Sequence, residues 1–445
     1  MAGRFVSGAV AVGIAWHLTA AASDDLVTIR QHDTLRSPFS PPTVDITADG
    51  RFVAFESFAR LVPADTNGDA DLYVLDRRTG VTTLETGALE PGVTVTRPRI
   101  SGDGRLLVFQ ITRLLESGAP QSEIVLCDRQ KATLTLVSKG VRGQPANGSS
   151  RDPDISDNGR VVVFSSTATN LTSDPDANAA EEDVFAWDVA SGILRRVNVT
   201  DAGSQPSIGA SFRPSISADG QAIAFVSLSD LDHRTPARPT GAQRRPTQIF
   251  VRDLALGKIT RISRTSKDRP PEKPSSSPAI SGDGRYVAFV SESPEIVDDD
   301  RNNASDVFLF DRLKETMTLV SRSAAGGSAN GVSTNPEVSF DGRFVAFQSD
   351  ASNIVCAHRC PAASEDVNLL WDVFVFDRFA GRSVLVSGDE NGGWMEASDG
   401  PALAASAPVV AFSSRHAIDM ADRSNDFDLF IRAPFEPPPI SLRMK

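Results

Sequence analysis

One strand-and-turn phrase recurs seven times in this chain, and the recurrence constrains the fold more than any other feature. The seven copies are TADGRFVAF (47–55), SGDGRLLVF (101–109), SDNGRVVVF (156–164), SADGQAIAF (217–225), SGDGRYVAF (281–289), SFDGRFVAF (339–347) and a degenerate ASAPVVAF (405–412). Their final phenylalanines are spaced 54 to 65 residues apart. A period of this length is typical of radial or solenoid arrays, in which each unit buries its apolar faces only against its neighbours.

Each repeat reads as four short strands joined by turns. In residues 277–321, SPAIS leads into the turn Gly282-Asp283-Gly284, and RYVAFVS, DVFLFD (306–311) and TMTLVS (316–321) follow. Val307 and Leu309 point to one face of the third strand and Phe308 and Phe310 to the other, so both faces of the sheet must be covered. Because no helical pattern could supply that cover, the sequence predicts an all-β, seven-bladed β-propeller of four-stranded antiparallel blades.

The third strand ends in aspartate in most copies, as in DLYVLD (71–76) and DVFVFD (372–377). We interpret these aspartates as turn formers rather than catalytic groups. The seventh unit lacks a fourth strand of its own, because the proline-rich tail after residue 432 disfavours one. We predict that an N-terminal strand (26–30, LVTIR) completes the last blade and closes the ring; Ile440–Leu442 is the alternative.

These repeats resemble those of the TolB-type β-propellers, a WD40-like family whose repeats carry a D-G-R turn before a V-A-F strand. The resemblance covers residues 43–432 and implies a propeller fold. TolB itself has an N-terminal α/β domain and six blades, whereas this chain lacks that domain and has seven copies. The resemblance therefore does not imply a role in the Tol–Pal system.

The N-terminus has the pattern of a secretory signal. Arg4 supplies a positive charge, residues 5–16 are mostly apolar, and Ala20 to Ala22 provide small residues for cleavage. The apolar stretch is shorter than the roughly 20 residues that a membrane span needs. We predict a signal peptide (1–22), one propeller domain (23–433) and a C-terminal tail (434–445). An uncleaved anchor and a buried strand are the alternatives for the first segment.

Composition narrows the range of partners. The formal net charge is −12 and the isoelectric point about 5.0, which argues against nucleic-acid binding because that function needs a basic surface. No other segment is long and apolar enough to span a membrane. We expect a secreted or periplasmic monomer.

Two of the four connections in each unit are long and variable. The second-to-third-strand connections are expected at 58–70, 111–122, 167–182, 228–247, 291–305, 349–371 and 414–426, and the fourth-to-first connections are similarly diverse. Both sets emerge on one side of a meander ring. Because binding residues concentrate on loops carried by a rigid scaffold, this long-loop face is the candidate functional face.

Most long loops are acidic, but basic residues gather around unit four. They are Arg234, Arg238, Arg244 and Arg245, with Arg264, Lys267, Arg269 and Lys273 in the neighbouring loop. We interpret this sector as a contact for an anionic group on a ligand or partner, and a solvated loop is the alternative. Trp371 and Trp394, in long loops of unit six, either contact a ligand or fold back over the blade.

The acidic loops contain a repeated spacing. Asp65-x-Asn67-x-x-x-Asp71 matches Asp300-x-Asn302-x-x-x-Asp306. Clustered oxygen ligands suit Ca²⁺, so calcium is the one cofactor that the sequence suggests. The alternative is an Asx turn that begins the third strand. An EF-hand is excluded, because the extended strand 71–76 would carry Asp76 roughly 16 Å from Asp71.

The three cysteines suggest no catalytic role. Cys127 falls in a strand and reads as a small buried side chain. Cys356 and Cys360 lie in one long loop, and an oxidising compartment favours a local disulfide between them. A metal site there is the alternative, although one such cluster has few ligands.

No catalytic motif is present: the chain lacks G-x-S-x-G and H-E-x-x-H. Asp154 and Glu337 are expected to line the central channel, in blades too far apart for direct cooperation. The sequence therefore favours a binding or scaffold protein that recognises a protein partner or cell-envelope ligand through its long-loop face. The alternatives are a propeller enzyme, such as a glycan lyase or hydrolase, acting at the channel mouth, and a calcium-stabilised structural module.

Overall fold

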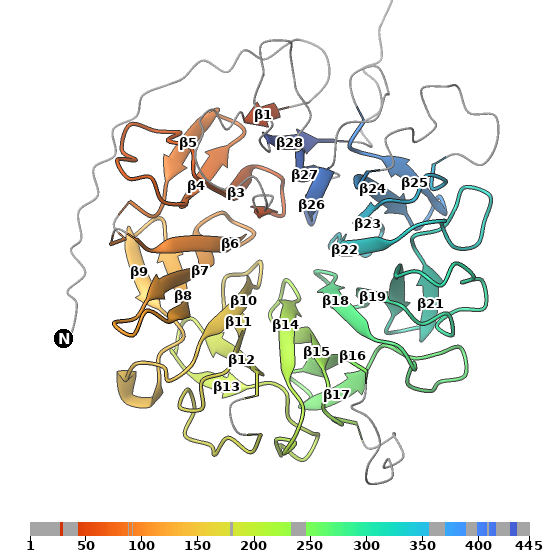
Figure 1. The fold of residues 1–445 in the computed structure, drawn as a ribbon, viewed down its shortest axis with the longest axis horizontal. Helices are drawn as coiled ribbons and strands as arrows, with labels where there is room; N and C mark the ends of the chain where they lie inside the picture. The colour runs from red at the N-terminus through yellow and green to blue at the C-terminus, as the bar shows by residue number, and fades with distance from the viewer. Residues whose placement is uncertain are drawn as a thin grey trace, which may run out of the picture.

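Seven four-stranded antiparallel sheets surround a common axis (Figure 1). The computed structural model describes residues 27–29, 43–87, 89–90, 92–178, 181–232, 246–355, 370–388, 398–406, 409–414 and 428–433. Six sheets consist of four consecutive strands ordered from the axis outward, as the meander pattern predicts. The predicted seven-bladed, all-β propeller is confirmed. Within the described ranges, no helix is long and apolar enough to cross a membrane.

The strands follow each other blade by blade. Blade 1 contains β2 (Val44–Ile46), β3 (Phe52–Ser57), β4 (Asp71–Asp76) and β5 (Val81–Leu84); blade 2 contains β6 (Thr94–Ile100), β7 (Leu106–Leu114), β8 (Pro120–Asp128) and β9 (Thr133–Leu136); blade 3 contains β10 (Ser150–Ile155), β11 (Val161–Ser166), β12 (Asp183–Asp188) and β13 (Leu194–Arg196). Blade 4 contains β14 (Ser211–Ile216), β15 (Ala222–Ser227), β16 (Gln248–Asp253) and β17 (Lys258–Arg261); blade 5 contains β18 (Ser275–Ile280), β19 (Tyr286–Ser291), β20 (Asp306–Asp311) and β21 (Thr316–Leu319). Blade 6 contains β22 (Ser333–Val338), β23 (Phe344–Ser349), β24 (Asp372–Asp377) and β25 (Arg382–Leu385), and blade 7 contains β26 (Ser398–Leu403), β27 (Val410–Ser414), β28 (Asp428–Arg432) and β1 (Val27–Ile29).

The N-terminal strand closes the ring as predicted. β1 pairs antiparallel with β28, with Val27 opposite Ile431 and Ile29 opposite Leu429. Blade 7 therefore combines the two ends of the propeller in one sheet, and β28 is not left as an open edge. The alternative closing segment, 440–442, lies outside the described residues.

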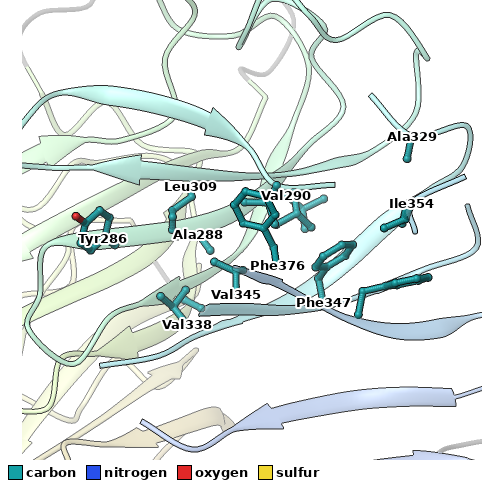
Figure 2. Close-up of a cluster of buried hydrophobic side chains, with 14 of the residues drawn as sticks. Tyr286, Ala288, Val290, Leu309, Ala329, Val338, Val345, Phe347, Ile354 and Phe376 are labelled. Carbon is teal, nitrogen blue, oxygen red and sulfur yellow. The ribbon is translucent and has the colours of Figure 1, made fainter. Parts of the chain in front are cut away.

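The two apolar faces of each blade are buried against different neighbours. In β20, Val307 and Leu309 pack with blade 6 residues such as Phe347, and Figure 2 shows this cluster. Phe308 and Phe310 of the same strand pack in a second cluster with blade 4. The alternation predicted for this strand is thus confirmed, and it explains why a blade needs a neighbour on each side.

In six of the seven blades, the phenylalanine that ends the repeat phrase packs on an aromatic side chain of the third strand; in blade 2, Phe109 lies opposite Val125 instead. Ring centroids lie 5.5 to 6.3 Å apart in the pairs Phe55–Tyr73, Phe164–Phe185, Phe225–Phe250, Phe289–Phe308, Phe347–Phe374 and Phe412–Phe430. Such cross-strand aromatic pairs contribute to stability beyond the area that they bury.

Blade 2 departs from the predicted loop at 111–122. β7 and β8, each nine residues long, continue through this region as a hairpin in which Thr112 pairs with Ser122 and Leu114 with Pro120. The β-branched residues Ile111 and Thr112 favour this extension. Gly118, with φ +78°, lies in the short turn that remains.

Candidate functional site

The short-turn rim, formed by the turns between first and second strands and between third and fourth strands, is locked together by backbone hydrogen bonds. The turn between the first and second strands of one blade is bonded to the same turn of the next blade. The bonds are Gly102 N to Asp157 O (2.9 Å), Asn158 N to Ala218 O (3.1 Å), Ala218 N to Gly282 O (3.0 Å), Asp283 N to Phe340 O (3.0 Å), Phe340 N to Ala405 O (2.8 Å) and Ser406 N to Ala48 O (2.8 Å). They join neighbouring blades at six of the seven junctions. The short-turn rim is therefore used to hold the ring together.

The recurring D-G-R turn has a structural explanation. In blade 2, the Asp103 carboxylate accepts the Ser101 hydroxyl (2.6 Å) and the Arg105 backbone N–H (3.0 Å). The Arg105 guanidinium donates two bonds, at 3.1 and 2.7 Å, to Asp128 at the end of β8. The same pair forms in three other blades: Arg51–Asp76, Arg285–Asp311 and Arg343–Asp377.

The closing aspartates also accept turn N–H groups, as predicted. Asp128 accepts those of Gln130 and Lys131, both at 3.2 Å. The bond from Arg105 is the main reason why the pKa of Asp128 falls to about 2. Sequence reasoning predicted the turn but missed the ion pair. The sequence does carry a signal for it, because the blades that form the pair have both an arginine in the D-G-R turn and an aspartate at the end of the third strand.

One equivalent position, the residue before the last in each innermost strand, faces the ring axis. From blade 1 to blade 7 these axial residues are Asp45, Arg99, Asp154, Ser215, Ala279, Glu337 and Ala402. Arg99 Nη1 lies 3.7 Å from Asp45 Oδ1 and 3.6 Å from Glu337 Oε1. A single long side chain thus links blades 1, 2 and 6.

Several axial residues also connect neighbouring blades. Asp45 Oδ2 accepts the Ile100 N–H at 2.7 Å, and Asp154 Oδ2 accepts the Ile216 N–H at 2.9 Å. Ser215 Oγ accepts the Ile280 N–H at 3.2 Å in the same way. Short acceptor side chains at this position therefore have a structural role. Asp45 was missed by sequence reasoning, although its place just before Ile46 matches that of the other axial residues.

Burial raises the pKa values of the acidic axial residues. It raises the pKa of Asp45 to about 7, against the opposing charge of Arg99. Burial also raises the pKa of Asp154 and of Glu337, again against Arg99. In the adjacent turn, burial and then the charge of Asp154 raise the pKa of Asp157 to about 6. Among the axial carboxyls, Asp45 therefore has a pKa close to neutral pH, a property that general acids and bases share.

Each innermost strand that contains a proline is bulged just before it. The residues before these prolines have positive φ: Arg97 (56°), Asp152 (53°), Arg213 (51°), Ser277 (49°), Asn335 (49°) and Gly400 (61°). The bulges shift the register by the same amount in each of these six blades. Arg97 forms an ion pair with Asp152 of the next blade.

The long-loop rim is formed by the connections between second and third strands and between blades, where the sequence predicts the basic sector. Arg234, Arg238, Arg244 and Arg245 lie outside the described residues. Lys267 and Arg269 are exposed in the connection between blades 4 and 5. Trp371 is partly buried at the start of β24, and its carbonyl accepts the Ser398 N–H at 2.7 Å; Trp394 lies outside the described residues.

A cavity of about 380 Å³ lies between blades 4 and 5. Arg264 lies there over the ring of Phe310, at 4.5 Å, and forms an ion pair with Asp268 at 3.0 Å. The lining contains five acidic residues (Asp201, Asp232, Asp253, Asp268 and Glu315) and four basic ones (Lys258, Arg261, Arg264 and Arg312). The cavity therefore does not add a net positive charge to the basic sector.

The predicted calcium residues of blade 1 are bonded within the protein. Asp65 Oδ1 accepts the Asn67 N–H (3.2 Å), and Asp65 Oδ2 accepts the Tyr73 hydroxyl (2.6 Å). Asp71 accepts the Thr86 hydroxyl (2.6 Å). The first of these bonds is the Asx turn that the sequence offered as the alternative. Within the described ranges, no group of three or more His, Cys, Asp or Glu side chains is placed to hold a metal ion.

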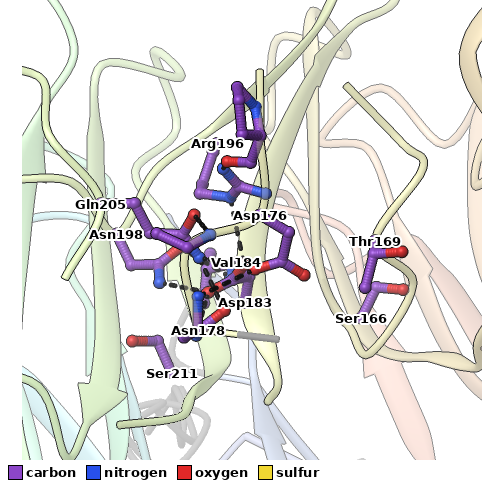
Figure 3. Close-up of polar contacts among 12 residues, drawn as sticks. Ser166, Thr169, Asp176, Asn178, Asp183, Val184, Arg196, Asn198, Gln205 and Ser211 are labelled. Carbon is purple, nitrogen blue, oxygen red and sulfur yellow. Dashed lines mark hydrogen bonds and ion pairs between the residues drawn. The ribbon is translucent and has the colours of Figure 1, made fainter. Parts of the chain in front are cut away.

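Blade 3 carries a related carboxylate in a dense polar network (Figure 3). Asp183, at the start of β12, accepts amide donors from Asn178 (3.0 Å), Asn198 (2.7 Å) and Gln205 (2.8 Å). Arg196 Nε lies 3.1 Å from Asp183 Oδ2, and both side chains are at most 5% exposed. The protein thus supplies its own cation and donors to this buried charge.

Cys127 is buried and free, as its strand position predicts, and burial raises the pKa of its thiol to about 12. A thiol with so high a pKa is not a nucleophile at neutral pH. Cys356 and Cys360 lie outside the described residues, so their disulfide stays a prediction.

No protein-family model matches the chain, and no curated protein matches it in sequence. Among solved structures, the chain is similar to an oligogalacturonate lyase from Vibrio parahaemolyticus, at 12% identity and a TM-score of 0.50, over 92% of this chain and 96% of that chain. An oligogalacturonate lyase in complex with manganese is similar at 14% identity and a TM-score of 0.50, over 91% and 95% of the two chains. A putative TolB from Agrobacterium tumefaciens matches at 19% identity with a TM-score of 0.38, over 64% and 81%. The likeness to the two lyases supports a β-propeller fold and no finer relationship.

Proposed function

We propose that this chain is an extracytoplasmic β-propeller that binds a protein partner or a cell-envelope ligand through its long-loop rim. One observation carries the proposal: the two rims differ in what their loops contact. The first turns of the short-turn rim are joined to each other by backbone hydrogen bonds. The long-loop rim varies from blade to blade in length, charge and contacts, as expected of loops that a rigid scaffold presents to a ligand.

The described basic residues indicate where an anionic ligand would contact this rim. Lys267 and Arg269 are both exposed. Arg264, close by in sequence, forms an ion pair with Asp268 and packs on Phe310, so it is less available. The extracytoplasmic location rests on the signal-like residues 1–22.

Binding to immobilised anionic probes tests the proposal. The probes are a polyuronate and vesicles that contain anionic phospholipid, with a neutral glucan as control. We expect the full chain to bind at least one anionic probe. The double variant Lys267→Glu, Arg269→Glu should bind about tenfold more weakly or worse, because each reversal replaces attraction by repulsion. The double variant Lys139→Glu, Arg142→Glu makes the same change of net charge at two exposed residues in the connection between blades 2 and 3, and it is the control. Absence of binding to every anionic probe, or equal loss in both variants, would refute the proposed sector.

A propeller enzyme is the second candidate, and one observation favours it. Asp45 has a pKa raised to about 7 and lies beside Arg99, a pairing that could serve proton transfer at the axis. The similar solved structures include oligogalacturonate lyases. Against this, Asp45 and Asp154 each accept a backbone N–H from the next blade. Release of an unsaturated, ultraviolet-absorbing product from polygalacturonate, abolished by Asp45→Asn, would favour the enzyme.

A further inference from the structure

Blades 1 and 5 carry the same loop spacing but differ in one aromatic residue. Asp65 and Asp300 each lie six residues before the aspartate that begins the third strand, and both are 6% exposed. In blade 1, the Tyr73 hydroxyl donates to Asp65 at 2.6 Å. Phe308 occupies the equivalent place in blade 5, with the same 5.8 Å stacking distance to its partner ring. Blade 5 therefore lacks the phenol that donates a hydrogen bond to the carboxylate of blade 1.

Three buried carboxylate oxygens of blade 5 have no hydrogen-bond partner. They are both side-chain oxygens of Asp300 and Oδ2 of Asp306. Asp306 is fully buried, and its other oxygen accepts the Ser321 hydroxyl at 2.6 Å. Leaving such groups unpaired in the interior is costly, and native proteins avoid it with a donor, a water or an ion.

The two carboxyls lie against each other. Asp300 and Asp306 interact directly, so their like charges oppose each other when both are ionised. Lys273 is the positive charge that faces Asp300. Lys273 is exposed and is not bonded to either carboxyl in the way that Arg196 is bonded to Asp183. The equivalent of Arg196 in β21 is Leu319, which supplies no charge.

We propose that the loop between β19 and β20 binds one Ca²⁺ ion, with Asp300 and Asp306 as its carboxylate ligands. The available donors are all oxygens, which excludes a soft metal site and suits a cation of flexible coordination. Asn302 lies between the two ligands in sequence, and its side chain holds the loop by donating to Ala329 O (2.8 Å) and accepting the Ala304 N–H (2.8 Å). Two carboxylates imply an affinity at the weak end of protein calcium sites, with Kd about 10⁻⁴ to 10⁻³ M.

Calcium titration of the chelator-treated full chain tests the proposal. Binding is followed by calorimetry and by the melting temperature, with CaCl₂ up to about 10 mM, well above the expected Kd. MgCl₂ at the same ionic strength is the control salt. We expect calcium, and not magnesium, to raise the melting temperature. Asp300→Asn should weaken this response about tenfold or more, which corresponds to the loss of one charged ligand.

Phe308→Tyr is the second variant, and it does not depend on removing a ligand. It installs the phenol of blade 1 and should abolish the calcium response without lowering the calcium-free melting temperature. Asp176→Asn, in the equivalent loop of blade 3, is the matched control and should leave the calcium response unchanged. A wild-type chain that does not respond to calcium, or a response that survives in both Asp300→Asn and Phe308→Tyr, would overturn the proposal and assign a shared proton to the pair.

Discussion

The two rims of the ring are made by the same seven repeats, yet they differ in tolerance to change. On the short-turn rim, the D-G-R turns bond to each other and to the third strands, so each turn depends on its neighbour. On the long-loop rim, the aspartate that begins the third strand has different partners in different blades: the Thr86 hydroxyl for Asp71 in blade 1, and Arg196 and Gln205 for Asp183 in blade 3. The comparison teaches that closure requires uniform turns on one side only, which leaves the other side free to diversify.

Removing the closing strand should have the largest effect. Deletion of residues 23–32 eliminates β1, whose three residues pair with β28. We expect a loss of at least about 3 kcal/mol in the free energy of unfolding, since each ladder hydrogen bond contributes about 1 kcal/mol and the ring loses its closure. Denaturant unfolding measures the loss. An unchanged midpoint would mean that another segment closes blade 7.

A pair of glycine substitutions compares the rims directly. Gly342, in a short turn, has φ +65°, and a Cβ there would lie 2.1 Å from Tyr286. Gly326, in the long loop after β21, has φ +95° and no atom within 4 Å of an added Cβ. We expect Gly342→Ala to lower the free energy of unfolding by roughly 2–4 kcal/mol, because it adds both conformational strain and the clash. Gly326→Ala should lower it by about 1 kcal/mol, from strain alone. Thermal unfolding of both variants provides the measurement, and equal costs would contradict the difference between the rims.

The axial carboxylate of blade 1 should show a smaller, pH-dependent effect. The pKa of Asp45 is about 7 in the folded state and about 4 in the unfolded chain. Between these values the folded protein holds a proton that the unfolded chain has released, so stability falls as the pH rises from 4 to 7 and levels off above it.

Asp45→Asn removes this titration and can still accept the Ile100 N–H. As the pH rises from 4 to 8, the free energy of unfolding of the variant should increase relative to that of wild type by on the order of 1–2 kcal/mol. This is less than the full pKa shift implies, because the Asp45 side chain is 18% exposed. Unfolding free energies measured across this range check the prediction. A constant difference between variant and wild type would show that Asp45 ionises normally.

Features of this molecule that depend on neighbouring residues in the sequence could be predicted, whereas features that depend on contacts between distant residues could not. The two-sided apolar pattern of residues such as Val307 and Phe308 predicts a blade that needs two neighbours, because strand alternation is a local rule. The N-terminal strand was predictable in the same way, as the fourth strand missing from the last repeat. The blade 2 hairpin was missed because its strand-forming residues continue beyond the shared repeat.

The candidate sites depended on contacts between distant segments. Arg99 joins blades 1, 2 and 6 because its long side chain crosses the axis, and no spacing in the chain reports that distance. The loop spacing suggested calcium in blades 1 and 5 alike. Only the packed blades distinguish them, because Tyr73 reaches Asp65 whereas Phe308 has no hydroxyl to offer Asp300.

By itself, the sequence determined the number of blades, their strand order and the segment that closes the ring, since repeated local patterns of apolar side chains and turn residues specify sheets that can be buried only by one another. The tertiary structure decided which buried charges find a partner. That outcome depends on side chains from different strands and blades meeting within about 3 Å, a condition set by packing geometry rather than by any local pattern.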